Sequence, residues 1–352
     1  MSADLLMEAR RQAEICNACR YCEGYCSVFP VLHSKRVFSD GDITQLANLC
    51  HNCRGCYYAC QYTAPHEFDL NLPKALAEVR RASWEEFAWP KPLAQLFHKS
   101  GVAIAAASIL GFAVLFWLAQ TMRPESGEGF YAILSHNLMV AIFLPAFLFP
   151  LVSIGISLRR YWQATGGGKL TAKAIQNALK SAATMKNLAG GHGDGCNFED
   201  DDRFSHARRH AHHAVMYGFL LCFLSTSSGT ILHYVFDAPA PYPFFSLPKL
   251  LGVPGGILMV IGTALLAHLK LRADKNLGDT SAWGGEMAFI LLLFAVALTG
   301  LLLYWLGATS LMPLLLAIHL GTVLAFFLLT PFTKMTHGFY RLAALCHEKS
   351  EK

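Results

Sequence analysis

The chain has 352 residues, 54% of them hydrophobic, and its formal net charge is +5. Its mean hydropathy of +0.35 argues against a purely soluble fold of this length. The net charge is modest, and we expect no nucleic-acid partner. The apolar residues are unevenly distributed along the chain. We therefore predict a polar, cysteine-rich domain over residues 1–95 and a membrane domain over residues 96–352.

The N-terminal end lacks the pattern of a secretory signal peptide, because residues 1–15 have no apolar core segment. The charged residues of this end include Asp4, Glu8, Arg10, Arg11 and Glu14. We therefore expect the N-terminal domain to remain in the cytoplasm, where thiols stay reduced.

Eight of the eleven cysteines form two copies of one pattern, C-x2-C-x2-C-x3-C. This spacing holds [4Fe–4S] clusters, and in two-cluster ferredoxins the fourth cysteine of each run binds the other cluster. We therefore predict two clusters side by side, which indicates a protein that moves single electrons. The predicted ligands are Cys16, Cys19, Cys22 and Cys60 for one cluster, and Cys50, Cys53, Cys56 and Cys26 for the other.

Two other uses of these cysteines fit the pattern less well. Zinc sites prefer paired C-x2-C units with a longer gap between them. Disulfides would need an oxidising compartment and a small secreted domain. One departure from the cluster signature concerns the residue after each run, which is Ser27 after Cys26 and Gln61 after Cys60, where bacterial ferredoxins have proline. This departure leaves the ligands intact but puts the local backbone turn in doubt.

The N-terminal domain is predicted to be helical. Residues 4–15, 42–49 and 73–87 have helical patterns, and Pro73 stands at a plausible helix start. The first two of these stretches run straight into the cysteine motifs. We therefore expect an α-helical ferredoxin-like domain, similar to the cluster-binding part of fumarate reductase and heterodisulfide reductase subunits. The fold class of the whole chain is then all-α.

Six apolar runs follow, and each reaches the length of about 20 residues that crosses a bilayer. Their expected bounds are 101–122, 131–158, 211–236, 247–271, 284–306 and 311–335.

The charges of the connecting loops predict the orientation of these runs. The long loop 159–210 contains nine Lys and Arg residues, whereas the loops expected on the opposite side contain only Arg123. By the positive-inside rule, both termini and loop 159–210 are cytoplasmic. We expect a multi-pass protein of the bacterial inner membrane. The long loop is expected to cover the bundle or contact a partner, and its glycine-rich stretch around Cys196 to dock that partner or shield a cluster.

Histidines near the ends of the third and sixth runs predict haem binding, because ionisable residues at membrane depth are usually functional. On a straight helix, His319 and His337 face the same way, since 18 residues make five full turns. The third run is antiparallel to the sixth, so we expect His212 at the depth of His337 and His233 at the depth of His319. Two histidine pairs at two heights are typical of stacked b-type haems.

Two further histidines leave alternatives open. His213 has a less favourable offset from His233 than His212 has, so His212 is preferred. His136 lies near the outer end of the second run and is an alternative outer ligand or a quinone contact. We expect one or two haems b in a six-helix bundle that resembles a b-type cytochrome.

The combination of two cysteine motifs with six such runs resembles the tricarballylate-utilisation protein B (citrate-utilisation protein B) family over essentially the whole chain. The shared elements are the segments Cys16–Cys26 and Cys50–Cys60, Gly-Cys196-Asn, His212-His213 with Tyr217-Gly218-Phe219, and Pro331-Phe-Thr-Lys-Met-Thr-His337. The last of these is also similar to the closing span of the nitrate-reductase gamma subunit, which binds two haems.

The resemblance implies a role in electron transfer. Members of this family accept electrons from a separate FAD-dependent dehydrogenase, which oxidises tricarballylate to cis-aconitate, and deliver them to membrane quinone. The chain itself has no G-x-G-x-x-G dinucleotide fingerprint. We therefore expect the substrate chemistry on the partner flavoprotein, and whether this chain is an enzyme in its own right stays open.

Two other functions remain alternatives at this point. One is a membrane subunit of another respiratory oxidoreductase, of the heterodisulfide- or nitrate-reductase type, which the identity of the partner would distinguish. The other is a haem-free iron–sulfur redox sensor or anchor, whose membranes would show no reducible b-type absorption band.

Overall fold

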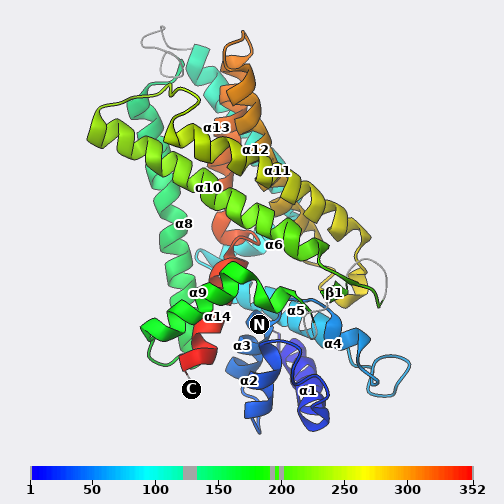
Figure 1. Ribbon diagram of the computed structural model, residues 1–352. Helices are drawn as coiled ribbons and strands as arrows, with labels where there is room; N and C mark the ends of the chain where they lie inside the picture. Colours follow the sequence, from blue (N-terminus) through cyan, green and yellow to red (C-terminus); the bar gives the residue numbers. More distant parts are fainter. Residues whose placement is uncertain (1, 122–132, 191–194, 198–201, 351–352) are drawn as a thin grey trace.

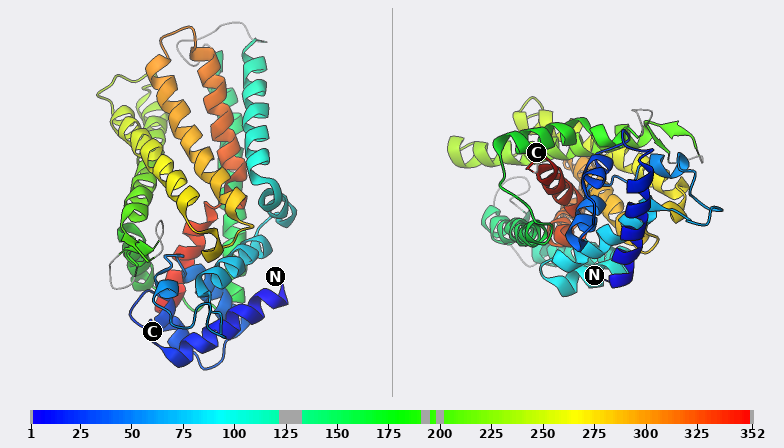
Figure 2. Two further views of the ribbon diagram at one scale, coloured as in Figure 1. Left: turned by 90° about the vertical axis from the view of Figure 1, so that its right-hand side faces the viewer. Right: turned by 90° about the horizontal axis from the view of Figure 1, so that it is seen from below.

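The computed structural model describes residues 2–121, 133–190, 195–197 and 202–350. Arg123, the single cation of the loops expected on one side of the membrane, lies outside the described residues. Figure 1 shows a bundle of long helices with a group of shorter helices at one end. We call this group the head, the adjoining end of the bundle the head end, and the opposite end the far end. Both chain termini lie on the side of the head (Figure 1, Figure 2).

The head is helical, as predicted. In the described residues its helices are α1 (Ala3–Cys19), α2 (Val28–Ser34), α3 (Asp40–Leu49), α4 (Gly55–Tyr58) and α5 (Leu72–Phe87). A capping box of Ser39 and Asp42 starts α3, because each residue satisfies a backbone N–H of the first turn. Asn71 caps α5, and Pro73 stands in its first turn, where no N–H is needed. These local signals explain why the sequence indicated the helices correctly.

Six helices of the described chain are long and apolar enough to cross a membrane, as predicted. They are Ser100–Gln120 within α6 (Lys91–Thr121), α8 (His136–Ala164), α10 (Ala207–Phe236), α11 (Leu247–Arg272), α12 (Trp283–Leu306), and a last span that starts with α13 (Met312–Leu329) and continues into α14 (Thr336–Ser350). Ser100 has a non-helical backbone and separates the first span from the preceding turns of α6.

The sixth run is not a straight helix, contrary to the expectation. α13 ends at Leu329, the 3-10 turn η4 (Thr330–Phe332) follows, and Thr333 is extended before α14 begins. Pro331 has no N–H to donate and disfavours a continuous helix. His319 and His337 therefore do not share one face of a straight helix, although their spacing predicted it, and only the tertiary structure places them.

Helices α10 and α11 pack closely along their length because small residues lie between them. A Cβ on Gly218 would come within 2.8 Å of the Gly255 carbonyl oxygen, and a Cβ on Gly262 within 2.8 Å of the Ala211 carbonyl oxygen. Small residues allow this close approach of helices in membrane proteins. α13 packs mainly on α6 and α12. The far ends of α10 and α13 are therefore separated (Figure 1, Figure 2).

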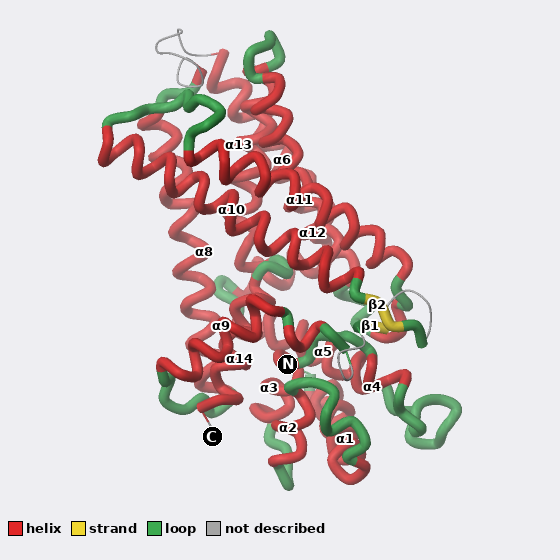
Figure 3. Tube along the Cα trace, viewed as in Figure 1, coloured by secondary structure: helices red, strands yellow, loops and turns green. Residues whose placement is uncertain are grey.

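The connection between α8 and α10 has secondary structure of its own. It contains α9 (Ala172–Thr184), the 3-10 turn η1 (Lys186–Leu188), and strands β1 (Cys196–Asn197) and β2 (Phe204–Ser205). The strands pair antiparallel and are the only ones in the described part of the chain (Figure 3). A shorter connection with the 3-10 turn η3 (Lys275–Leu277) joins α11 to α12. Apart from the strand pair, the described chain is all-helical, as predicted.

The core of the head includes part of the C-terminal helix. Tyr340 and Ala344 of α14 are buried in the same apolar cluster as residues of α1, α2, α3 and α5. Gln45 of α3 donates a hydrogen bond from Nε2 to the Ala344 carbonyl oxygen at 2.8 Å. Helix α14, which the sequence division at residues 1–95 and 96–352 leaves with the membrane domain, thus joins the head to the bundle.

Candidate functional site

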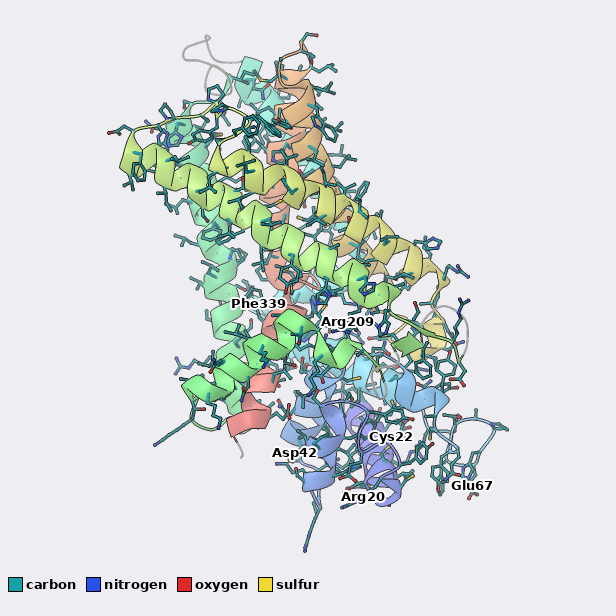
Figure 4. The ribbon with its side chains drawn as sticks, in the orientation of Figure 1. Arg20, Cys22, Asp42, Glu67, Arg209 and Phe339 are labelled. Atoms are coloured by element: carbon teal, nitrogen blue, oxygen red, sulfur yellow. The ribbon has the colours of Figure 1, made fainter. Side chains whose placement is uncertain are left out.

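Four of the five cysteines that line a hollow of the head, which we call the first hollow, are the predicted ligands of one cluster. Cys16 and Cys19 lie in the last turn of α1, Cys22 follows in the next turn, and Cys60 lies just beyond α4. Together they line a cavity of about 240 Å³. Cys19 is exposed, so the first hollow meets the surface. Figure 4 marks Cys22 in this part of the head.

The other four motif cysteines line a second hollow. Cys26, Cys50, Cys53 and Cys56 surround it, and Cys56 also lines the first hollow, so the two adjoin. The second hollow is much narrower, with a free volume of about 20 Å³, and Asn187 of η1 forms part of its wall. The grouping of thiols matches the crossed arrangement of a two-cluster ferredoxin. Cluster binding itself stays a prediction.

Both motifs turn at the same relative position. Arg20 and Arg54, the residues after the second cysteine of each motif, have left-handed backbones with φ of 57° and 68°. This conformation is uncommon for residues with a side chain and is found preferentially at functional sites. It ends α1 after Cys19 and precedes α4, so that the chain reverses between the cysteines of each motif. The two motifs thus share this left-handed residue as well as their spacing, whereas Asn52 of the second motif is also left-handed, with φ of 50°, and its counterpart in the first motif is helical.

The thiols of each hollow make one another harder to ionise. Burial and the other thiols of the first hollow raise the pKa of Cys16 to about 12. Burial and the thiols of the second hollow raise the pKa of Cys26 well above its usual value. Grouped thiolates repel one another, whereas a bound metal deprotonates its thiol ligands and neutralises them. This donor set therefore fits an iron–sulfur cluster in each hollow.

The thiols do not converge on one point. In the part of the chain that the structure describes, no group of three or more His, Cys, Asp or Glu side chains is arranged for a single metal ion. A four-iron cube offers a separate iron to each thiolate, so its ligands stand around a larger body than one ion. Two four-thiol hollows therefore suit clusters better than mononuclear metal sites.

Three arginines from distant parts of the chain hold the backbone of the second hollow, and we call them the arginine clamp (Arg80, Arg208 and Arg341). Arg80 of α5 and Arg341 of α14 donate to the Cys50 carbonyl oxygen at 2.7 and 2.6 Å. Arg208 of α10 donates to the Asn52 carbonyl oxygen at 2.8 Å. Positive charge and hydrogen bonds around a cluster raise its reduction potential.

A fourth arginine lies within the second motif. Arg54 is buried, with 6% of its surface exposed. Burial, and then the charge of Arg208, lower the pKa of Arg54 to about 10. The second hollow is thus surrounded by positive charge that the bundle helps to supply.

A ninth thiol, Cys196, lies beside the second hollow. It is fully buried, packs near Cys53, and donates from Sγ to the Leu188 carbonyl oxygen at 2.9 Å. Gly195 has a φ of +106°, and a Cβ there would lie 2.7 Å from the Ser205 carbonyl oxygen, so only glycine fits. Cys196 thus lies near Cys53 of the second hollow, and whether this stretch docks a partner or shields a cluster stays a prediction.

The structure brings His212 and His337 together at the head end. Their ring centroids are 5.8 Å apart and their planes meet at 78°. His337 Nδ1 donates to the Lys334 carbonyl oxygen, which leaves Nε2 with a lone pair. His212 Nδ1 is buried and has no hydrogen-bond partner among the described residues. His213, the less preferred alternative, packs against Tyr217 instead. Two half-buried imidazoles with lone pairs to share fit the axial positions of a haem.

The expected second pair, His233 with His319, is not observed. The ring of His233 stacks on that of His136, with 4.1 Å between centroids, and His136 Nε2 lies 2.8 Å from the Tyr234 hydroxyl. Within the described residues, no contact joins His233 to His319. The reason is tertiary, because α10 follows α11 rather than α13 toward the far end. His136, predicted as an alternative outer ligand or a quinone contact, thus lies against His233, and its role stays a prediction.

His319 lies between α12 and α13. Its Nδ1 is 3.0 Å from Thr299 Oγ1, and that hydroxyl donates to the Ala295 carbonyl oxygen at 2.7 Å. The imidazole is therefore the donor to Thr299, and its Nε2 keeps a lone pair. A Cβ on Gly300 would come within 3.0 Å of the ring, so glycine leaves room for it. Thr299 and Gly300 thus fix the position of the His319 ring, which does not contact His233.

Comparison with known proteins identifies the family. A profile described as Citrate utilization protein B matches residues 89–352, and one described as Citrate utilization protein B Fer4-like domain matches residues 9–86. The chain belongs to the Citrate utilization protein B family. A curated Escherichia coli protein of that name is 42% identical over 350 residues, which cover 98% of this chain and 92% of the relative. No solved structure matches this member of the family.

Membership of the Citrate utilization protein B family confirms the resemblance inferred from the motifs. The Fer4-like profile covers both cysteine motifs, and Fer4 names an iron–sulfur fold. The two profiles meet where α5 ends and α6 has not yet begun. The family thus joins a head of iron–sulfur type to the six-helix bundle.

Sequence reasoning missed a half-buried ion group as well as the arginine clamp. Glu286 of α12 lies 2.5 Å from Lys270 Nζ of α11 and 2.7 Å from Lys334 Nζ, just before α14. Lys334 also accepts the hydrogen bond from His337 through its carbonyl oxygen. These residues are too far apart in sequence for helical periodicity to link them. Only the packing of three helices shows that they neutralise one another near His337.

Proposed function

We propose that this member of the Citrate utilization protein B family is a membrane electron-transfer protein. When bound, two [4Fe–4S] clusters and one or two haems b would supply one-electron redox chemistry. The observation that carries the proposal is the grouping of eight motif thiols in two adjoining hollows against the head end of the bundle. The Fer4-like profile over the same segment supports it.

The two hollows suit different ends of an electron path. The first hollow meets the surface at Cys19, where a partner has access to it. The second is held by Arg208 and Arg341, which belong to helices of the bundle. Electron transfer between centres needs proximity but no opening to solvent. We therefore propose entry at the first hollow and exit from the second toward the bundle.

We propose His212 and His337 as the axial ligands of a haem b at the head end. The support is their mutual contact, the hydrogen bond that orients His337, and the unshared nitrogen of His212. The residues available to a second haem are His319, His136 and His233. His213 is the weaker alternative to His212.

The proposed electron donor is the reduced flavin of a separate FAD-dependent dehydrogenase resembling tricarballylate dehydrogenase, and the proposed acceptor is membrane quinone. Family membership supports the connection, because the relative is named for citrate utilization. We propose that the bundle lies in the bacterial inner membrane with the head and both termini in the cytoplasm. The excess of Lys and Arg in the connection between α8 and α10 supports this orientation.

Anaerobic purification of the full chain tests the proposal. We expect about eight non-haem iron and eight acid-labile sulfide per chain, together with a b-type band in the pyridine haemochrome assay. Oxidation of the dithionite-reduced protein by a quinone analogue should then follow in stopped-flow absorption. A correctly folded protein without iron or colour would contradict the proposal.

A further inference from the structure

Helix α9 and the segment around it carry basic residues and no acidic ones. Residues 159–190 contain no Asp or Glu. The lysines on and beside the helix are Lys169, Lys173, Lys180 and Lys186. A segment of this composition attracts anionic groups, because no acidic side chain of its own neutralises it.

Three different stripes run along α9. Ala174 and Ala178, one turn apart, are buried, and Ala178 belongs to the core cluster that contains α14. The next stripe is apolar but uncovered, since Ile175 is 41% and Leu179 is 51% exposed. The lysines lie on a third face. The chain thus leaves an apolar stripe of α9 unpacked beside a basic one, the pattern of a helix that lies in a membrane interface.

Both ends of α9 are tied to helices that are long enough to span a membrane. Trp162, in the last turn of α8, donates from Nε1 to the Gly168 carbonyl oxygen at 3.2 Å. The Tyr217 hydroxyl donates to the Ala183 carbonyl oxygen at 2.9 Å, and Tyr217 lies ten residues after the start of α10 at Ala207. Trp and Tyr are enriched where membrane meets water.

We propose that α9 is an interfacial helix, with Ile175 and Leu179 inserted at the level of the lipid headgroups and its lysines bound to anionic phospholipid. Figure 1 shows α9 lying across the head end of the bundle, where the hydrogen bonds of Trp162 and Tyr217 hold it. Because α8 ends and α10 begins on this side, α9 cannot leave the surface of the bilayer that these helices cross. The proposal rests on the six spans crossing a membrane and is independent of the electron-transfer function.

Lipid fits this surface better than a protein partner does. A bilayer surrounds the spans on every side and meets any apolar stripe held at its edge. A row of lysines without acidic residues complements a layer of phosphates, whereas an interface core between proteins is usually depleted of lysine.

Helix α9 is connected to the second hollow by the residues that follow it in the chain. α9 leads directly into η1, whose Asn187 lines that hollow and whose Leu188 accepts the hydrogen bond of Cys196. Fixing α9 in the bilayer therefore also fixes one wall of the second hollow.

Hydrogen–deuterium exchange of the full-length protein in nanodiscs tests the proposal. The probes are discs of phosphatidylcholine alone and discs containing phosphatidylglycerol. Exchange from a helix depends on local opening, which bound lipid suppresses. We expect the amides of α9 to exchange more slowly in the anionic discs, by about fivefold for each bound lysine. High salt should reduce the difference.

Paired variants separate the two parts of the interaction. Lys173→Gln with Lys180→Gln should remove the dependence on phosphatidylglycerol, and Ile175→Asn with Leu179→Asn should speed exchange in both kinds of disc. Lys74→Gln, on α5 of the head, is the matched control and should behave as the wild type. Unchanged exchange of α13 amides shows that each variant keeps its fold.

Some results would overturn the proposal. Equal exchange of α9 in both discs, or a lysine variant that keeps the lipid dependence, would remove the lipid site. Protection that develops only when a soluble flavoprotein is added, or only when two copies share a disc, would assign the surface to a protein partner. Purification without iron or haem would end the proposed function but leave this measurement unaffected.

Discussion

The two hollows of the head share one cysteine spacing and differ in their exposure and in the distant residues that contact them. The first is lined by residues of the head itself and meets the surface at Cys19. The second is walled by Asn187 from the connection between α8 and α10, and its backbone is held by the arginine clamp. Two of the three clamp residues come from helices of the bundle.

The difference shows that a repeated motif acquires its chemistry from distant residues. Burial limits the access of oxidants to a cluster, and nearby positive charge stabilises its reduced form. The comparison therefore predicts that a cluster in the first hollow, the outer cluster, is accessible to oxidants. A cluster in the second hollow, the inner cluster, is predicted to be protected and to have the higher reduction potential.

The largest effect is expected from Cys53→Ser, which removes a thiolate from the second hollow. We expect the loss of the inner cluster, and with it about half of the iron, because serine is a poor ligand for this cluster. Electron flow from reduced flavin to quinone should stop. Iron analysis and stopped-flow absorption measure both outcomes. Cys346→Ala, a buried cysteine outside both hollows, is the control, and normal quinone reduction by the Cys53→Ser variant would refute the electron path.

The next effect concerns the histidines of the bundle that are proposed to bind haem. His337→Ala and His319→Ala should each remove haem while both clusters keep their iron, because neither histidine lines a hollow. The pyridine haemochrome assay measures haem and chemical analysis measures iron. His210→Ala, near the start of α10, is the control for an exposed histidine. A full haem complement in both variants would overturn the ligand assignment.

A smaller effect concerns the access of oxidants to the two hollows. During titration with ferricyanide in the dark and without oxygen, the outer cluster should be destroyed several-fold faster than the inner one, since only Cys19 of the ligands is exposed. Electron paramagnetic resonance of samples reduced at intervals follows the two signals. Simultaneous loss of both would mean that the arginine clamp and η1 give the second hollow no protection.

The smallest effect isolates the charge of the clamp. Arg341→Gln should lower the reduction potential of the inner cluster by roughly 40 mV, the equivalent of about 1 kcal/mol for one electron, and leave the outer one unchanged. A redox titration followed by electron paramagnetic resonance measures both potentials. Arg36→Gln, an exposed arginine of the head, is the control. Equal shifts of the two potentials would exclude a local effect of Arg341.

Local patterns predicted much of this molecule. The grouping of Cys26 with the second motif and Cys60 with the first followed from spacing alone, because a short chain turn limits where each thiol can reach. The helical head and the six long apolar helices followed in the same way, from capping residues and from segment length.

The pairing of the membrane histidines was less predictable. It assumed a straight helix between His319 and His337, and Pro331 with η4 breaks that helix. It also assumed that α10 and α13 run together, whereas His233 meets His136 at the far end. The contact of His212 with His337 is observed even so, although the periodicity used to expect it does not hold.

By itself, the sequence determined the thiols, the apolar lengths and the family, since each depends on residues within a few turns of one another or on similarity along the chain. Only the tertiary structure decided which arginines hold the second hollow, that α14 completes the core of the head, and which histidines meet. Such contacts join residues up to hundreds of positions apart, and their geometry depends on the packing of all the helices between them, which no local pattern records.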